Sequence, residues 1–159
     1  MKFYIAYGSN LNCAQMRYRC PDAFVLADRK LKGYELVFRG NSRGNGVLTI
    51  EKNPKTSVPV GIWAISDEDE KNLDAYEGYP TLYRKEYLPI EYKGKTYRAL
   101  VYIMNEKGHD ITPPHRYYLG TCIEGYKNFG FDTTPLEDAV LNASAYAWNS
   151  RFENIPSWA

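Results

Sequence analysis

Short apolar runs and alternating apolar and polar positions dominate the first two thirds of the chain, and both patterns are typical of β-strands. The run Phe3-Tyr4-Ile5-Ala6 predicts a buried strand close to the N-terminus. Lys93-Gly94-Lys95 separates two later strands and predicts a β-hairpin, and Asn53-Pro54-Lys55 predicts a turn. The strands expected after the first lie in residues 23–39 (one or two, interrupted at Gly33), 47–50, 58–65, 86–92 and 96–103.

Apolar positions at helical spacing appear mainly in the last third of the chain. One helix is predicted from Pro113-Pro114 to Gly130, and another begins at Thr134-Pro135-Leu136-Glu137, which has the sequence of a capping box. Two earlier helices are predicted, over residues 12–19 and from the cap residue Ser66 to Gly78.

This order, with strands first, helices last and few β-α-β alternations, indicates an α+β fold. We expect a mixed, mostly antiparallel sheet curled into a β-barrel with flanking helices. Because there is no internal repeat or linker, residues 1–159 are expected to form a single domain. Phe152, Ile155 and Trp158 predict that the C-terminal segment docks on this body.

The charge balance narrows the class of partner. Twenty basic residues face 19 acidic ones, for a formal net charge of +1, which argues against nucleic acid or a membrane surface held by net charge. No apolar stretch approaches the length of a membrane span and no secretory pattern is present, so we expect a cytoplasmic protein with reduced thiols. Three cysteines without a C-x-x-C pair, and only two histidines, argue against a metal site.

The stretch Tyr7-Gly8-Ser9-Asn10-Leu11 joins the first predicted strand to the first predicted helix. Gly8 permits a tight turn or a close approach of a ligand to the backbone, and Ser9 and Asn10 are typical cap and turn residues. Such a junction presents free backbone N–H groups beside the positive end of a helix dipole, which suits a carboxylate or a phosphate. The loop is therefore a candidate site for a small anionic ligand; a capped turn without a ligand is the alternative.

Glu77 is the candidate catalytic carboxylate. It lies at the C-terminal end of the helix that stops at Gly78, where the helix dipole disfavours a negative charge. Enclosure by Tyr76, Tyr79 and Tyr83 would disfavour ionisation further, so we expect a raised pKa. A carboxylate that titrates near neutral pH can take a proton in one step and return it in the next. An exposed polar residue at a helix end is the alternative interpretation.

Three stretches in order along the chain together resemble the γ-glutamylcyclotransferase-like family (AIG2-like, γ-glutamylamine cyclotransferase-like). The resemblance extends over residues 1 to about 131 and implies a curled mixed β-barrel with flanking helices. It also implies an enzyme that cyclises a small-molecule γ-glutamyl amide to 5-oxoproline and releases the amine or amino acid, with no metal, nucleotide or organic cofactor. The stretches are Tyr7-Gly8-Ser9-Asn10-Leu11, then Leu73-Asp74-Ala75-Tyr76-Glu77-Gly78 followed by Tyr83-Arg84, and Pro113-Pro114 before Tyr117.

Carried over by position, the resemblance implies that Glu77 is the general acid/base. Tyr117 corresponds to a late tyrosine near the substrate, and the adjacent Tyr118 is the alternative match. Arg84 is either a salt-bridge partner or a substrate contact. The residues implied to hold the γ-glutamyl group through their backbone amides are Tyr7, Gly8, Ser9, Asn10 and Leu11.

Two other classes of function fit parts of the pattern. A non-catalytic module that binds a small γ-glutamyl or carboxylate ligand would keep the loop. The carboxylate of Glu77 argues against such a module, because a protein that only binds an anionic ligand gains nothing from a nearby negative charge, unless Glu77 pairs with the ligand's ammonium. A thiol-dependent hydrolase would use Cys13 with a histidine, but a small buried thiol is the simpler interpretation of Cys13. The sequence names neither the particular γ-glutamyl amide nor the oligomeric state.

Overall fold

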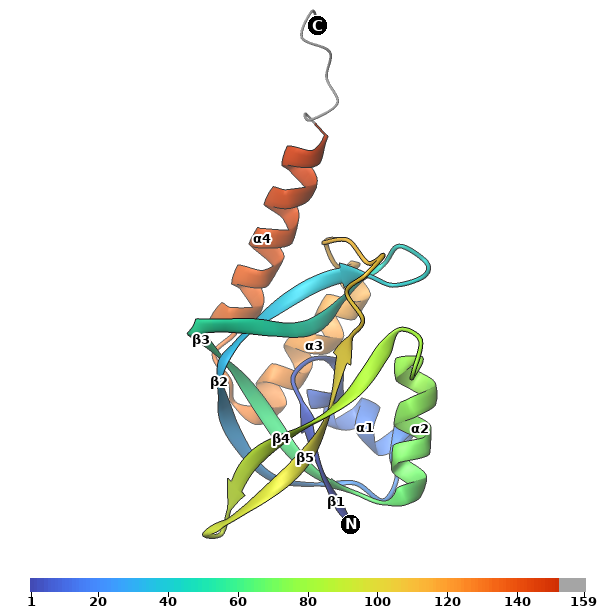
Figure 1. The fold of residues 1–159 in the computed structure, drawn as a ribbon, viewed down its shortest axis with the longest axis vertical. Coiled ribbons are helices and arrows are strands. Elements are labelled where there is room, and N and C mark those ends of the chain that lie inside the picture. The colour runs from blue at the N-terminus through green and yellow to red at the C-terminus, as the bar shows by residue number, and fades with distance from the viewer. Residues whose placement is uncertain (152–159) are drawn as a thin grey trace, which may run out of the picture.

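A mixed five-stranded sheet with strand order β2-β3-β1-β5-β4 forms the centre of the computed structural model, which describes residues 1–151 (Figure 1). The docking predicted for Phe152, Ile155 and Trp158 lies outside these residues. The strands are β1 (Lys2–Ala6), β2 (Phe24–Gly40), β3 (Gly46–Ile65), β4 (Tyr83–Tyr92) and β5 (Lys95–Met104). The helices are the short 3-10 turn η1 (Ser9–Leu11), α1 (Cys13–Arg19), α2 (Asp67–Glu77), α3 (Arg116–Phe129) and α4 (Thr134–Ser150).

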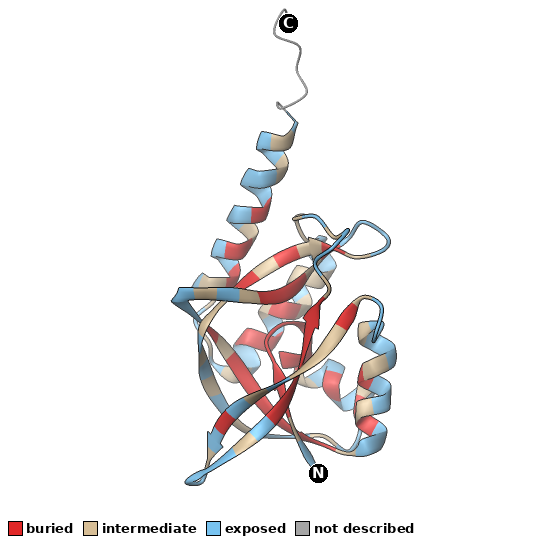
Figure 2. Ribbon diagram, viewed as in Figure 1, coloured by how far each residue is buried: buried red, intermediate tan, exposed pale blue. Residues whose placement is uncertain are grey.

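Strand β1 occupies the middle of the sheet, antiparallel to β3 and parallel to β5. The remaining neighbours, β2 with β3 and β4 with β5, are antiparallel hairpins. The predicted α+β class and the mixed, mostly antiparallel sheet are therefore confirmed. Figure 2 shows that the buried residues concentrate along the central strands, as the apolar run at the start of the chain predicts.

The sheet is curled but open, so the predicted closure into a barrel is wrong. Its two edges are β2 and β4, and no backbone ladder joins them within the described part of the chain. Instead the Arg29 side chain of β2 donates to the carbonyl of Glu91 on β4, from Nε at 3.1 Å and Nη2 at 2.8 Å. A long side chain thus bridges a gap that a closed barrel would fill with main-chain hydrogen bonds.

Strand β3 is continuous where the sequence predicts two strands and a turn. Lys32 pairs with Ser57 and Tyr34 with Lys52, so residues 53–56 lie opposite Gly33 alone. The turn-forming residues therefore make a bulge in a long strand, because pairing with β2 resumes on both sides of it. Gly33 has φ +85°, a conformation that glycine adopts without strain.

Both ends of α2 are where the sequence predicts them. The Ser66 hydroxyl accepts from the Asp69 amide, and the Asp69 carboxylate accepts from the Ser66 amide, which completes a capping box. Gly78 ends the helix in the left-handed conformation, with φ 63°. Glu77 is the last residue of the helix because Gly78 ends it, and Leu73 packs into the core and so orients the helix.

The last two helices start differently from the prediction. Helix α3 begins at Arg116 with His115 as its cap, two residues beyond Pro114, and ends at Gly130 as expected. The capping box expected at Thr134 is not formed, because Thr133 is the cap residue and the Asp132 carboxylate accepts from the Thr134 amide instead. The buried residues of α4 all lie between its start and Ala143, namely Leu136, Ala139 and Ala143.

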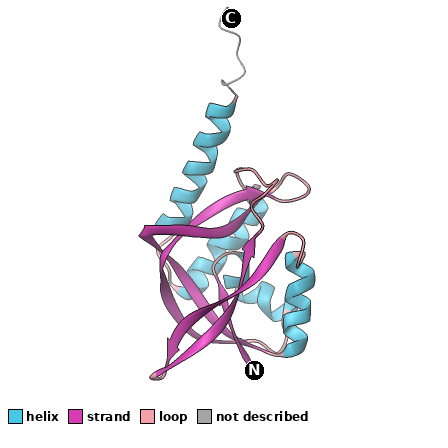
Figure 3. Ribbon diagram, viewed as in Figure 1, coloured by secondary structure: helices cyan, strands magenta, loops and turns pink. Residues whose placement is uncertain are grey.

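The rest of α4 extends away from the sheet, whereas α1, α2 and α3 lie beside it (Figure 3). Helix α3 packs on η1, the turn that follows β1. None of the helices within residues 1–151 combines the length and the apolar character needed to cross a bilayer.

Candidate active site

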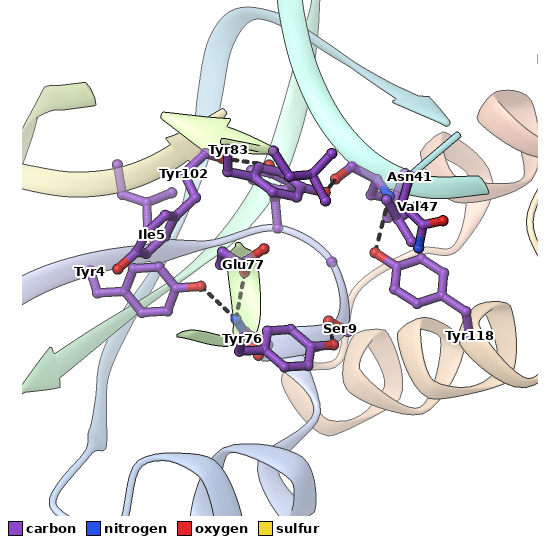
Figure 4. Close-up of a pocket in the computed structure, with 15 residues that line it drawn as sticks. Tyr4, Ile5, Ser9, Asn41, Val47, Tyr76, Glu77, Tyr83, Tyr102 and Tyr118 are labelled. Atoms are coloured by element: carbon purple, nitrogen blue, oxygen red, sulfur yellow. Dashed lines mark hydrogen bonds between the residues drawn. The ribbon is translucent and has the colours of Figure 1, made fainter. Parts of the chain in front are cut away.

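A pocket of about 90 Å³ opens where β1 ends and η1 begins (Figure 4). One water needs about 15 Å³ on such a measure, so the pocket suits a small-molecule group. Of the side chains that line it, Glu77 alone is formally charged, within the part of the chain that the structure describes. The lining residues are Tyr4, Ile5, Tyr7, Gly8, Ser9, Asn10, Asn41, Val47, Leu48, Tyr76, Glu77, Leu82, Tyr83, Tyr102 and Tyr118.

The two candidate stretches of the sequence meet in this pocket. Residues 7–10 line one wall, and Glu77 projects from the end of α2 beside them. Leu11 does not line the pocket, because its side chain is fully buried beneath the loop. The site predicted from the loop and Glu77 is thus brought together, with Leu11 as a core residue.

The late tyrosine of the pocket is Tyr118. Tyr117 is 69% exposed and lies outside the pocket, so the structure places the alternative match, Tyr118, at the pocket instead. Neighbouring residues of a helix point about 100° apart, and α3 turns the face that carries Tyr118 and Cys122 inward. In Figure 4 the Tyr118 ring lies across the pocket from Tyr4, with Glu77 and Ser9 between them.

Burial raises the pKa of Glu77 from 4.5 to about 7, against the opposing effects of the Arg19 charge and a hydrogen bond from Asn10. That bond joins Asn10 Nδ2 to Glu77 Oε1 at 3.2 Å. Tyr76 and Tyr83 line the pocket as expected, but Tyr79 does not, since its ring lies under the ammonium of a lysine outside the pocket. The carboxylate therefore titrates near neutral pH, as a shuttle of protons requires.

Four of the tyrosine hydroxyls around the pocket fall into two pairs. Tyr7 donates to the carbonyl of Tyr102 and Tyr83 donates to that of Leu48, each at 2.6 Å, so both protons are committed to the backbone. Tyr4 accepts from Asn10 Nδ2 at 2.8 Å, and Tyr118 accepts from the Leu48 amide at 3.0 Å. An accepting hydroxyl keeps its own proton to donate, so Tyr4 and Tyr118 can each offer one to a ligand.

Burial also keeps these hydroxyls neutral. It raises the pKa of Tyr4, Tyr7, Tyr83 and Tyr118 well above the ordinary value of a tyrosine. At physiological pH these four tyrosines are therefore hydrogen-bond donors without charge.

The loop itself is held from two sides. Ser9 Oγ and Tyr76 Oη lie 3.0 Å apart and join it to α2. Asn12 caps α1 by accepting from Gln15, and its Nδ2 donates to the carbonyl of Thr121 on α3 at 3.1 Å. The first N–H groups of a helical turn have no partner within the turn, so the rigid start of η1 can offer them to an anion.

The remaining candidates from the sequence lie outside the pocket. Arg84 donates to the carbonyl of Met104 and pairs with Glu86 at 3.5 Å, which is a structural role. Cys13 does not line the pocket, and burial raises the pKa of its thiol, which disfavours the thiolate that a nucleophile needs. Within residues 1–151 no three His, Cys, Asp or Glu side chains are grouped so as to hold a metal ion.

Sequence reasoning missed Tyr4, Asn41, Tyr102 and the nearby Arg19. Tyr4 belongs to an apolar strand and looks like a core residue, which it also is, at 3% exposed. Asn41 and Tyr102 reach the pocket from the start of a loop and the end of a strand far away in the sequence. Nothing in the local pattern around Arg19 marks it.

Comparisons with known proteins agree on one family. The sequence model described as "Gamma-glutamyl cyclotransferase, AIG2-like" matches residues 4–120. The gamma-glutamylcyclotransferases of Homo sapiens and Bos taurus are each 30% identical to the chain over 146 residues, which cover 84% of this chain and 73% of the relative.

Solved structures show the same fold. One named "Gamma-glutamyl cyclotransferase" has a TM-score of 0.74 at 24% identity and covers 87% of this chain and 85% of its own. An uncharacterized protein from Homo sapiens has a TM-score of 0.75 at 24% identity, with the same coverage.

Proposed function

The chain belongs to the gamma-glutamyl cyclotransferase, AIG2-like family of enzymes, and from that premise we propose that it converts a γ-glutamyl amide into 5-oxoproline and a free amine, with Glu77 as general acid/base. The observation that carries the proposal is that Glu77 is the single charged group lining the pocket among residues 1–151. Glu77 is partly buried, titrates near neutral pH and faces a space for a small molecule. This is the arrangement that a proton shuttle needs.

The pocket is complementary to a γ-glutamyl group. The α-ammonium of the γ-glutamyl group would pair with Glu77, whose Oε2 makes no hydrogen bond to any of the described residues. The α-carboxylate of the γ-glutamyl group would accept hydrogen bonds from the N–H groups at the start of η1, since no cationic side chain lines the pocket in residues 1–151. The γ-carbonyl would then lie within reach of Tyr118 or Tyr4, whose hydroxyls can donate to it.

The first half of the reaction makes the ring. Glu77 takes a proton from the α-ammonium, and the neutral amine attacks the γ-carbonyl carbon, so that a C–N bond forms and the carbonyl oxygen becomes negative. A bound, folded chain reacts within itself, which greatly favours closure of a five-membered ring. A tyrosine hydroxyl or a loop amide stabilises the developing oxyanion.

The second half breaks the original amide. The protonated Glu77 returns its proton to the departing nitrogen, the bond from that nitrogen to the γ-carbon breaks, and the carbonyl re-forms. The ring nitrogen loses its extra proton to water, and the released amine takes up a proton from water. The products are 5-oxoproline and the amine or amino acid, and Glu77 is again a carboxylate.

Direct detection of 5-oxoproline tests the proposal. The purified protein is mixed with γ-glutamyl amino acids, γ-glutamyl amines and glutathione, next to Glu77→Gln and the control Glu68→Gln. Glu68 lies on the same helix with a side chain 72% exposed, so the control makes the same chemical change away from the pocket. We expect product from the parent and from Glu68→Gln, and a loss of roughly 10²- to 10⁴-fold in Glu77→Gln.

Two results would contradict the proposal. An equal rate in Glu77→Gln would remove Glu77 from the chemistry. Binding of γ-glutamyl compounds by the parent protein without any product would instead support a non-catalytic binding module.

A further inference from the structure

Arg19, the last residue of α1, touches two residues of the pocket without lining it. Its Nη1 donates to Asn10 Oδ1, and its guanidinium lies over the Tyr76 ring, 3.4 Å from the ring centre. Asn10 contacts Glu77, and Tyr76 contacts Ser9. One side chain outside the pocket is thus connected to both the loop and the end of α2.

The contact with Arg19 decides which way the Asn10 amide points. A guanidinium can only donate hydrogen bonds, so the atom that faces it must be the acceptor Oδ1. Asn10 Nδ2 is then turned toward Tyr4 Oη, at 2.8 Å, and Glu77 Oε1, at 3.2 Å. Without Arg19 only the two contacts of Nδ2 would hold the amide, and a rotated amide would place an oxygen against the carboxylate.

The contact with Tyr76 is the second half of the arrangement. Tyr76 is 44% exposed at the rim of the pocket, so few other groups hold its ring. A guanidinium stacked on an aromatic ring is attracted by the ring's electrons. The stacked ring presents its hydroxyl to Ser9 Oγ, at 3.0 Å, and so joins the loop to α2.

We propose that Arg19 is a positioning residue for this active site, which fixes the Asn10 amide toward Glu77 and the Tyr76 ring over the loop. The inference rests on the proposed role of Glu77 in catalysis. It assigns to Arg19 a part in the reaction although Arg19 does not contact the space that the substrate would occupy.

Among residues 1–151, Arg19 is the cationic side chain whose charge acts on the Glu77 carboxylate. Four titratable groups face the carboxylate, each from a different part of the chain. They are Tyr4 in β1, Tyr7 directly after β1, Tyr83 in β4 and Arg19 in α1. The three tyrosines stay neutral, since burial raises the pKa of each well above its ordinary value. Arg19 is therefore the charge that offsets the effect of burial on Glu77 in the described structure.

The pKa of Glu77 can be measured without any activity, by NMR titration of ¹³C-labelled glutamate carboxyls, with Glu77→Gln used to assign the resonance. We expect Arg19→Met to raise this pKa by about one unit or more, because a cation close to a carboxylate lowers its pKa by that order. Arg19→Lys should restore most of the shift. Arg17→Met removes an equal charge from the exposed side of the same helix and should leave the pKa of Glu77 unchanged.

The rate of 5-oxoproline formation gives a second readout. If Glu77 acts as a base, a rise of one unit lowers kcat/KM about fivefold at pH 7 in Arg19→Met, and the loss disappears near pH 9, where Glu77 is ionised in both proteins. A purely structural role for Arg19 would lower kcat/KM by the same factor at every pH.

An unchanged Glu77 pKa in folded Arg19→Met overturns the inference, and so does an equal shift in Arg17→Met. If Arg19→Met does not fold, Arg19→Gln also lacks the charge and must show the same rise in pKa. A parent protein that makes no 5-oxoproline would instead refute the proposed function, while the titration would still decide whether Arg19 positions Glu77.

Discussion

Gly125 of α3 lies against the backbone at Asn12, so closely that a Cβ atom on Gly125 would be 2.6 Å from the Asn12 amide nitrogen. The same Cβ would be 2.7 Å from the carbonyl carbon of Leu11. Helix α3 therefore supports the end of the pocket loop through direct backbone contact, which only glycine permits.

Gly125→Ala should displace this loop. Because the contacted atoms belong to the backbone, we expect a loss of about 2 kcal/mol in the free energy of unfolding, as for an overpacked core, together with weaker substrate binding. Gly120→Ala is the matched control, since nothing lies within 4 Å of a Cβ at Gly120 and alanine favours the helix by up to about 1 kcal/mol. Chemical denaturation and KM measure both effects; equal behaviour of the two variants would contradict the close contact.

Gly8 should tolerate alanine but not valine. A Cβ on Gly8 would lie 3.2 Å from Leu48 Cδ1 and 3.5 Å from Tyr118 Oη, a tight fit that small movements of the Leu48 side chain can relieve. The extra methyl groups of valine would crowd these neighbours at the wall of the pocket. We expect a modest rise of KM in Gly8→Ala and a loss of roughly tenfold or more in kcat/KM for Gly8→Val. Unchanged affinity of Gly8→Val for γ-glutamyl ligands would remove this part of the loop from the site.

Tyr118→Phe should be far more harmful than Tyr117→Phe. The first variant leaves the Leu48 amide without its acceptor, at a cost of about 1–3 kcal/mol of stability, and removes a hydroxyl donor from the pocket. If that hydroxyl stabilises the oxyanion, kcat should fall roughly 10²-fold or more. The exposed Tyr117 serves as the control, with parent values expected for both stability and kcat. A loss of stability in Tyr118→Phe with kcat intact would leave Tyr118 as a structural residue.

Glu77→Gln should change the pH dependence of stability. The pKa of Glu77 is raised from 4.5 to about 7 in the folded protein, so the folded state binds more protons than the unfolded chain between these values. Unfolding therefore becomes easier as the pH rises through this window, by at most about 3 kcal/mol at 1.4 kcal/mol per pKa unit. Glu77→Gln lacks this loss, so its stability relative to the parent should increase from pH 4 to pH 8.

Glu70→Gln should show the opposite sign. Burial alone would raise the pKa of Glu70, but its hydrogen bonds to Lys2 and Lys85 outweigh burial and the pKa is lowered. The ionised Glu70 thus contributes stability above its unfolded pKa, and this contribution disappears as the pH falls through the folded pKa. Thermal unfolding at several pH values measures both variants; a parallel response of the two would contradict the raised pKa of Glu77.

The sequence alone determined what depends on neighbours along the chain. The capping box of Ser66, the left-handed glycines that end α2 and α3, and the β4–β5 hairpin each form from a few adjacent residues. The apolar run of β1 likewise indicates its burial wherever its partners lie in the sequence. The loop after β1 and the position of Glu77 at a helix end follow from the same local signals.

Tertiary structure alone decided what depends on distant contacts. Asn10 and Glu77 are 67 positions apart, and their hydrogen bond exists because α2 packs with its last turn beside η1. Pairing over the whole length of β2 and β3 made the predicted turn into a bulge, and a side-chain bridge took the place of barrel closure. The orientation of α3 chose Tyr118 over Tyr117, and Arg19 joined the site through the packing of α1. Such choices are made by packing, since a local pattern marks a residue as polar or apolar but does not name the distant residue it will contact.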